Sequence, residues 1–509
     1  MAPGTASGPA PMLAPMSDTP QQTEQTQQTQ HTDQPRHTAH TAHTDAGISP
    51  NLVTAIREKV AADGGTIKKE LADLVAFPSV HGEEDTKDAC RNAAARVAEL
   101  FAEAGVDLDS HVTVDGSIAL TGHIPAPEGR PTVLLYSHYD VQPAGDVSAW
   151  TADPWTLDER DGRWYGRGTA DCKGNVVMHL AALRALRALK ELGDDPASGI
   201  ELPGIRIVVE GSEERGSAGL EDLTRTRPEL FAADVILIAD VGNVAVGRPT
   251  LVTTLRGTAD VDVRVDTLAG PVHSGMFGGA APDALAALMR LLDSLRDENG
   301  ATRIDGLDCD QTWEGLGYDA ETFRSDAGVL DGVDLVSDGA GASVADLTWA
   351  RPALIVTGID CPPATNAVNA IPSTATAHLN LRVPPGMDPK EAQDKLVAHL
   401  ESHVPWNARV EITRDVLASS FSADVEGDVV KHVEACLAAS YGRETERMGE
   451  GASIPLCATL LEAVPGADIV LYGVEEPQCR IHSSDESVDP REIRDIAVAE
   501  ALILATIGR

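Results

Sequence analysis

Hydrophobic and polar residues follow two different spacings along this chain. In the segments 51–77 and 85–105, apolar residues recur every three to four positions, which predicts amphipathic helices. Three further segments are short runs of apolar and β-branched residues, which predicts buried strands of a sheet. They read PTVLLYSH, IRIVVEGS and DVILIAD, and each run ends in polar residues. The pattern is typical of an α/β domain.

The polar ends of these three runs carry candidate active-site residues. His138 ends the first run, the pair Glu213 and Glu214 follows the second, and Asp240 ends the third. Ligands of open α/β sheets bind beyond the carboxyl ends of the strands, so these side chains are expected to converge. Between the first two runs, the Gly-rich turn GRGTADCKG presents Asp171 just before an amphipathic helix. Asp171 is therefore expected in the same crevice.

A second kind of pattern begins near residue 256. ADVDVRVDT and the later STATAHLNLRVPPG alternate strictly between apolar and polar residues, and APDALAALMRLLDSLRD has helical spacing. Strand and helix units without buried parallel strands predict a smaller α+β sandwich, a lid or dimerisation domain inserted at 256–384. The mixed-sheet catalytic domain then comprises residues 48–255 and 385–509.

Residues 1–47 are rich in Gln, Thr, Pro and Ser and end in HTAHTAHT, with too few apolar side chains for a core. We expect a disordered tail there. Its histidines could capture a metal ion, but polar low-complexity tails are common without such a role.

Composition narrows the possible partners. At 509 residues and 42% hydrophobic content the chain predicts two or more folded domains. The net charge of −39 disfavours nucleic acid and anionic membrane as partners. Neither a long apolar run nor a secretory signal pattern is present, and seven scattered cysteines do not suggest a disulfide framework. The expected location is the cytoplasm.

The candidate residues are those of a two-metal hydrolase. Imidazoles and carboxylates suit Zn²⁺, Mn²⁺ or Co²⁺, and a pair of such ions can polarise a carbonyl and acidify a shared water. This favours hydrolysis of an amide. Taken singly, each residue has an ordinary reading: an acidic pair is usually a solvated turn, and a lone histidine such as His482 usually lies on the surface or in the core. The glycines of GRGTADCKG lack the spacing of a phosphate-binding loop.

An ordered series of motifs resembles a known family. HYDVQP, GRGTADCKG, EGSEERGS, PVHSGMFGG, ATNAVNAIP to LRVPPG, EGASIP and IHSSDE follow one another over residues 50–509. Together they resemble the dinuclear metallopeptidases that include carnosine dipeptidases, aminoacylases and glutamate carboxypeptidases, with PVHSGMFGG most similar to the cytosolic dipeptidase branch.

The resemblance implies a role for each metal-site residue. Asp171 would bridge two divalent ions per subunit, with Zn²⁺ expected first and Mn²⁺ or Co²⁺ as alternatives. His138 and Asp240 would complete one site, and Glu214 and His482 the other. Glu213 precedes a ligand and can act as general base and acid. Asp140, two residues after His138, can accept the second N–H of that imidazole.

The resemblance also implies residues outside this set. His273 would reach across a homodimer interface to the oxyanion, where an added donor stabilises the transition state. Asn369, Arg382 and Ser453 align with substrate-holding positions, and Arg382 suits a bidentate grip on a terminal carboxylate. Asn369 departs from the hydroxyl residue that dipeptidase relatives often have there. His273 could instead belong to an ordinary turn, and Arg382 could be an exposed strand residue.

We therefore predict a cytoplasmic, homodimeric metal-dependent dipeptidase that cleaves short peptides with a free carboxylate. An N-acyl amino acid deacylase would use the same metals on a different acyl group. A binding or scaffold protein that holds metal without turnover is a third possibility, which the presence of both Glu213 and Asp140 disfavours.

Overall fold

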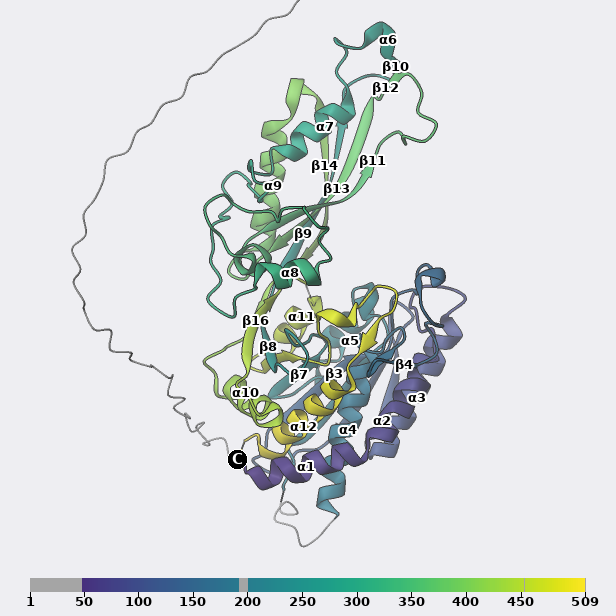
Figure 1. The fold of residues 1–509 in the computed structure, drawn as a ribbon, viewed down its shortest axis with the longest axis vertical. Coiled ribbons are helices and arrows are strands. Elements are labelled where there is room, and N and C mark those ends of the chain that lie inside the picture. Colours follow the sequence, from purple (N-terminus) through teal and green to yellow (C-terminus); the bar gives the residue numbers. More distant parts are fainter. Residues whose placement is uncertain (1–47, 192–199, 453, 509) are drawn as a thin grey trace, which may run out of the picture. The chain divides into compact units, whose positions relative to one another are not determined.

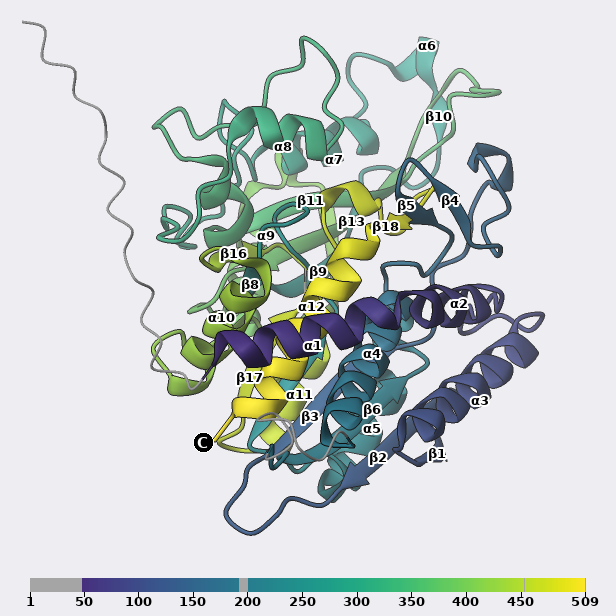
Figure 2. The same ribbon diagram turned by 60° about the horizontal axis from the view of Figure 1, so that its bottom comes forward.

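The computed structural model describes residues 48–191, 200–452 and 454–508. The tail expected at 1–47 and the candidate Ser453 lie outside the described residues. Two sheets, one large and one small, organise the described part of the chain (Figures 1 and 2). The mixed α/β architecture expected from the sequence is confirmed.

The larger sheet has nine strands among the described residues, in the order β1-β2-β6-β3-β7-β17-β8-β15, with β16 also beside β8. β6, β3, β7 and β17 are parallel neighbours. β2 runs antiparallel to β1 and β6, whereas β8 runs antiparallel to β17 and β15 but parallel to β16. The bounds are β1 Leu108–Val112, β2 Ile118–Ile124, β3 Thr132–His138, β6 Gly204–Glu210, β7 Val235–Ala239, β8 Thr250–Leu255, β15 Phe421–Ser422, β16 Glu446–Glu450 and β17 Asp468–Tyr472.

Helices cover both faces of this sheet because its central strands are apolar on both sides. Val133 and Leu135 of β3 belong to the core formed with one set of helices, and Leu134 and Tyr136 to the core on the opposite face. The first set is α1 Pro50–Ala62, α2 Gly64–Val75, α3 Lys87–Ala104, α4 Lys173–Lys190, α10 Asp428–Tyr441 and α12 Pro490–Thr506. The second set is α5 Ala218–Thr226 and α11 Pro455–Ala463. Figure 2 shows α1, α4 and α12 together on their side of the sheet.

The smaller sheet has the strand order β11-β13-β9-β14, all antiparallel. Alternate residues of β13 are buried, as its sequence pattern predicts, and they pack with α7 and α9. The bounds are β9 Gly257–Asp266, α7 Ala284–Asp293, β11 Ala353–Asp360, β13 Thr374–Val383, α9 Pro389–His403 and β14 Arg409–Ala418.

The contacts of α9 and β14 bear on where the inserted domain ends. The sequence pattern predicts that the catalytic domain resumes at residue 385. In the structure, α9 packs on the small sheet and β14 pairs with β9 along most of its length. We therefore propose that the inserted domain extends to about residue 418. The helical pattern of 389–403 is visible in the sequence, but it does not reveal which sheet the helix covers.

Smaller elements complete the fold. β10 Val272–His273 and β12 Ala370–Ile371 form a two-stranded ribbon, and the short helix α6 Ser274–Phe277 directly follows β10 in the chain. A three-stranded sheet joins β18 Ser487–Val488, β5 Arg163–Tyr165 and β4 Asp158–Arg160. The segment 305–351 contains α8 Ala320–Asp326 and a short π-helix η4 Asp346–Ala350.

All seven cysteines have unpaired thiols, and five of them are buried. Within the described ranges, no helix is both long enough and apolar enough to cross a membrane.

Candidate metal centre

The candidate site lies where three neighbouring parallel strands end. His138 is the last residue of β3, and Asp240 directly follows β7. Glu213 and Glu214 lie in the 3₁₀ turn η2 Glu213–Arg215, just after β6. Since β6, β3 and β7 are adjacent and parallel, their carboxyl ends meet at one edge, as the sequence pattern predicts.

Asp171 lies between two imidazoles. Its Oδ1 is 3.0 Å from His138 Nε2, and its Oδ2 is 2.9 Å from His482 Nε2. The His138 Nε2 is also 3.0 Å from Asp240 Oδ1, and the His482 Nε2 is 3.2 Å from Glu214 Oε2. The site thus consists of two groups, His138 with Asp240 and His482 with Glu214, joined by one carboxylate.

Asp140 fixes the geometry of both the first imidazole and the acidic turn. Its Oδ1 lies 3.3 Å from His138 Nδ1, and its two carboxylate oxygens accept hydrogen bonds of 3.1 Å from the backbone N–H groups of Glu213 and Glu214. Of these contacts, only the one with His138 is predicted from the sequence. The side chain of Asp140 is fully buried, so its charge depends on these donors.

Glu213 is close to the cluster without being one of its nearest members. Its Oε2 lies 3.9 Å from His138 Nε2, and 19% of its side chain is exposed. Burial raises the pKa of Glu213 well above its usual range, and the nearby carboxylates of Asp240 and Asp171 raise it further. A carboxyl in this environment binds a proton more readily than an ordinary glutamate.

Glu486 ties together the two loops that carry Asp171 and His482. One of its carboxylate oxygens accepts the backbone N–H groups of Ala170 and Asp171, and the other accepts from Gly168 N and from Arg167 Nη1 at 2.7 Å. Glu486 is fully buried. Glu486 stands within the IHSSDE motif, but the sequence does not reveal its role because its hydrogen-bond partners are distant in the chain.

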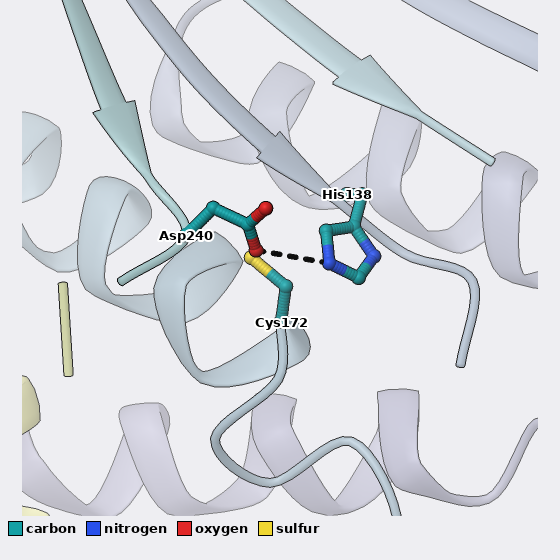
Figure 3. Close-up of side chains that lie close together, drawn as sticks. All are labelled: His138, Cys172 and Asp240. Carbon is teal, nitrogen blue, oxygen red and sulfur yellow. Dashed lines mark hydrogen bonds and ion pairs between the residues drawn. The ribbon is translucent and has the colours of Figure 1, made fainter. Parts of the chain in front are cut away.

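Cys172 is a second residue that the sequence analysis did not single out. Its Sγ lies within 4.8 Å of ligand atoms of His138 and Asp240, and it donates a hydrogen bond to the Ala239 carbonyl. Figure 3 shows the thiol beside the Asp240 carboxylate and the His138 ring. The only available signal was its position directly after Asp171.

The donor set fits divalent cations. Asp171, Glu214 and His482 form one group able to hold an ion, and His138, Asp240 and Cys172 form another. Burial raises the pKa of Asp240 to about 6 and that of the neighbouring Glu450 to about 7, so negative charge is crowded in a buried space. Divalent cations would neutralise this negative charge, and the imidazole and carboxylate ligands present suit Zn²⁺, Mn²⁺ or Co²⁺.

Other predicted site residues lie elsewhere in the fold. His273 and Asn369 belong to the β10–β12 ribbon region, where Asn369 O accepts from Ser274 N. Among the described residues, neither makes a hydrogen bond or ion pair with the metal-site cluster. Arg382 lies on β13, opposite Thr258 of β9.

The ring of His273 is exposed and held by its own turn. Its Nδ1 accepts hydrogen bonds from Gly275 N and Met276 N at 3.1 and 3.2 Å. The proton of a neutral imidazole is then on Nε2, which faces away from these bonds. The structure therefore presents His273 as a hydrogen-bond donor.

Comparison with known proteins places this arrangement in a family. The model of Peptidase family M20/M25/M40 matches residues 134–508. The chain belongs to this family. The recognition of dinuclear metallopeptidase motifs in the sequence is thereby confirmed, and this peptidase is a metal-dependent enzyme.

Individual relatives refine the comparison. The peptidase is 48% identical over 446 residues to a cysteinylglycine-S-conjugate dipeptidase of Corynebacterium striatum, covering 87% of this chain and 96% of the relative. It is 27% identical to a β-Ala-His dipeptidase of Rattus norvegicus, covering 86% and 89% of the two chains. The solved structure of human carnosine dipeptidase 1 has a TM-score of 0.74 at 23% identity, covering 89% of this chain and 98% of that one. The yeast dipeptidase Dug1p gives 0.73 at 21% identity, with 91% and 99% covered.

Proposed function

We propose that this metal-dependent dipeptidase cleaves dipeptides with a C-terminal glycine and an N-terminal cysteine or S-substituted cysteine. The observation that carries the hydrolytic function is the placement of Asp171, whose two oxygens face His138 and His482 separately. The substrate class is supported by the name of the Corynebacterium striatum relative and by 48% identity over most of both chains.

The peptidase would hold two divalent ions per subunit. His138 and Asp240 would bind one, Glu214 and His482 the other, and Asp171 would bridge them. Zn²⁺ is the expected ion, with Mn²⁺ and Co²⁺ as alternatives. Such a pair would polarise the scissile carbonyl and acidify a water molecule.

Glu213 would move the protons. It would accept a proton from the attacking water and deliver it to the leaving amine, and its partly exposed carboxyl beside His138 supports this role. Asp140 would act as a positioning residue, since it holds both the His138 ring and the backbone of Glu213.

Two arginines support recognition of the terminal carboxylate. Burial lowers the pKa of Arg256, and the positive charge of the nearby Arg382 lowers it further, to about 10. A substrate carboxylate near this pair would relieve the repulsion between the two guanidinium groups. Arg256 stands in the TTLRG segment and is not among the residues that the sequence analysis chose.

A homodimer would complete the site. His273 presents Nε2 as a donor but makes no polar contact with the metal-site cluster of its own chain in the described residues. Apolar side chains in or beside β10, α6 and β12 are exposed, namely Met276 at 75%, Phe277 at 48% and Val368 at 78%. β11 is an edge strand of the small sheet and exposes Ile355 and Ile359. Apolar patches and open strand edges of this kind are typical of interfaces.

Mixing two inactive variants tests the contribution of His273 in trans. His273→Ala and Glu213→Gln homodimers are each expected to be nearly inactive. After subunit exchange, each mixed dimer has one site with both residues intact, so activity is expected to recover to about a quarter of the wild-type value. Activity no higher than the mean of the two parents, with mixed dimers verified by native mass spectrometry, would exclude the trans role.

Metal removal tests the overall function. Chelator-treated protein is expected to lose hydrolysis of Cys-Gly and Ala-Gly and to regain it on addition of Zn²⁺, Mn²⁺ or Co²⁺. Initial rates on these dipeptides and on N-acetyl amino acids provide the measurement. Cleavage of the N-acetyl compounds alone would identify a deacylase. Metal binding without turnover on any amide would favour the binding-protein alternative.

The cytoplasmic location expected from the sequence remains a prediction. The unpaired thiols of all seven cysteines are compatible with a reducing compartment.

A further inference from the structure

A large cavity adjoins the metal-site cluster. It has a volume of about 710 Å³, and its lining includes Ile481 and Ser483, the two neighbours of His482. Gly242, two residues beyond Asp240, and the half-buried Glu450 also line it. The cavity is therefore lined by chain neighbours of the cluster residues His482 and Asp240, and a substrate bound at the cluster could extend into it.

One wall of the cavity is aromatic and comes from the segment 305–351. Tyr318 and Trp349 line the cavity and stack with ring centroids 5.3 Å apart. Trp313 and Phe323 pack edge-on against this pair at 5.4 and 5.2 Å. Aromatic residues make up only 4% of the chain, yet four of them form this cluster. Such a concentration next to a reaction site points to recognition of an apolar group.

The aromatic wall is anchored to the large sheet. Leu316 N donates to Arg447 O of β16 at 3.1 Å. A Cβ on Gly449 of β16 would lie only 2.7 Å from Trp349 Cβ, so the strand and the tryptophan are in direct contact. The sulfur-containing side chain of Met448, on the same strand, also lines the cavity.

The charged residues of the remaining lining are mostly acidic. Glu450 and Glu475 each have a buried carboxylate oxygen without a hydrogen-bond partner among the described residues. Asp326 and Glu476 add further carboxylates, and Arg480 is the basic residue of the lining. Glu476 is paired with Arg163 at 2.6 Å. An anionic group would be repelled from such a space, whereas a neutral apolar group can pack on the aromatic and thioether side chains.

We propose that this cavity is the pocket for the sulfur substituent of the N-terminal cysteine, and that it selects neutral apolar or aromatic thioethers over anionic ones. The inference rests on the proposed function, because it assumes a dipeptide at the metal site. It goes further in naming the residues that determine specificity, foremost Tyr318, Trp349 and Met448.

Three substrates and four variants test the proposal. The metal-loaded enzyme is assayed for kcat/KM on Ala-Gly, S-benzyl-Cys-Gly and S-carboxymethyl-Cys-Gly. Wild type is expected to prefer the S-benzyl compound to both others by about tenfold or more, the range of one or two good aromatic contacts. Tyr318→Ala is expected to lower the ratio of S-benzyl-Cys-Gly to Ala-Gly by about five- to tenfold, while Tyr318→Phe keeps it. Ala327→Trp, which places a bulky ring in the cavity, is expected to lower the same ratio.

The matched control is Trp406→Ala, which removes a 54% exposed aromatic ring of the inserted domain that does not line this cavity. It is expected to leave the ratio unchanged. An unchanged ratio in both Tyr318→Ala and Ala327→Trp would overturn the proposal, and so would a wild-type enzyme that cleaves Ala-Gly at least as well as S-benzyl-Cys-Gly. Absence of cleavage of all three dipeptides would instead refute the proposed function.

Discussion

Glu213→Gln is expected to lower kcat by roughly 10²- to 10⁴-fold, the usual contribution of general acid and base catalysis. The amide is nearly isosteric with the carboxylate, but it cannot take a proton from water and return it to the leaving amine. Glu213 lies 3.9 Å from His138 and takes part in none of the four contacts of 2.9 to 3.2 Å among the proposed metal ligands. The Glu213→Gln variant should therefore retain its metal ions. Steady-state kinetics on Ala-Gly, together with metal analysis of the same sample, measure both effects.

Glu229→Gln is the matched control for this variant. Glu229 is an exposed glutamate outside the cluster, so its replacement should leave kcat and KM unchanged. Unchanged turnover in folded, metal-loaded Glu213→Gln protein would remove the proposed proton-transfer role. A rise in KM with kcat preserved would assign Glu213 to substrate binding instead.

Asp171→Asn is expected to abolish stable binding of the metal pair and, with it, activity. Asp171 is the only residue of the cluster that contacts both imidazoles, and the amide removes the charge that would neutralise two cations. The metal content, measured by elemental analysis after gel filtration, should fall from about two ions per subunit to one or fewer. Thermal unfolding gives an independent readout, since a ligand at 100 times its Kd stabilises the folded state by about 2.7 kcal/mol.

For this variant the control is Asp109→Asn, which changes an exposed aspartate on the edge strand β1. Added Zn²⁺ should raise the Tm of wild type and of this control, but not that of Asp171→Asn. Full metal content and full activity in Asp171→Asn would contradict the bridging role, and loss of folding would show as a lowered Tm already in metal-free protein.

The local patterns of the chain account for much of the fold. A strand such as β3 is apolar on both sides because helices cover both faces of the sheet, and this is visible as the continuous run TVLLYS. The positions of His138, Glu213 and Asp240 directly after such runs follow from the same rule, since parallel strands end at one edge. The alternation along β13 likewise predicts a strand with one buried face.

Long-range pairing accounts for what these patterns could not predict. The spacing of α9 and β14 indicates a helix and a strand, yet only long-range contacts show that both join the small sheet. The role of Glu486 depends on long-range hydrogen bonds, since its carboxylate accepts from the backbone N–H groups of Ala170 and Asp171. The aromatic wall combines Tyr318 and Trp349 with Met448 of β16, which is distant in the chain.

The sequence by itself therefore determined the α/β class, the family and the group of residues around Asp171, because periodicity, strand ends and short motifs are local properties of the chain. Only the tertiary structure decided which sheet α9 and β14 join, that Asp140 and Glu486 accept from the backbone of the loops that carry Glu213 and Asp171, and which side chains line the adjoining cavity. These features depend on contacts between residues far apart in sequence, and local spacing does not predict which distant segments come into contact.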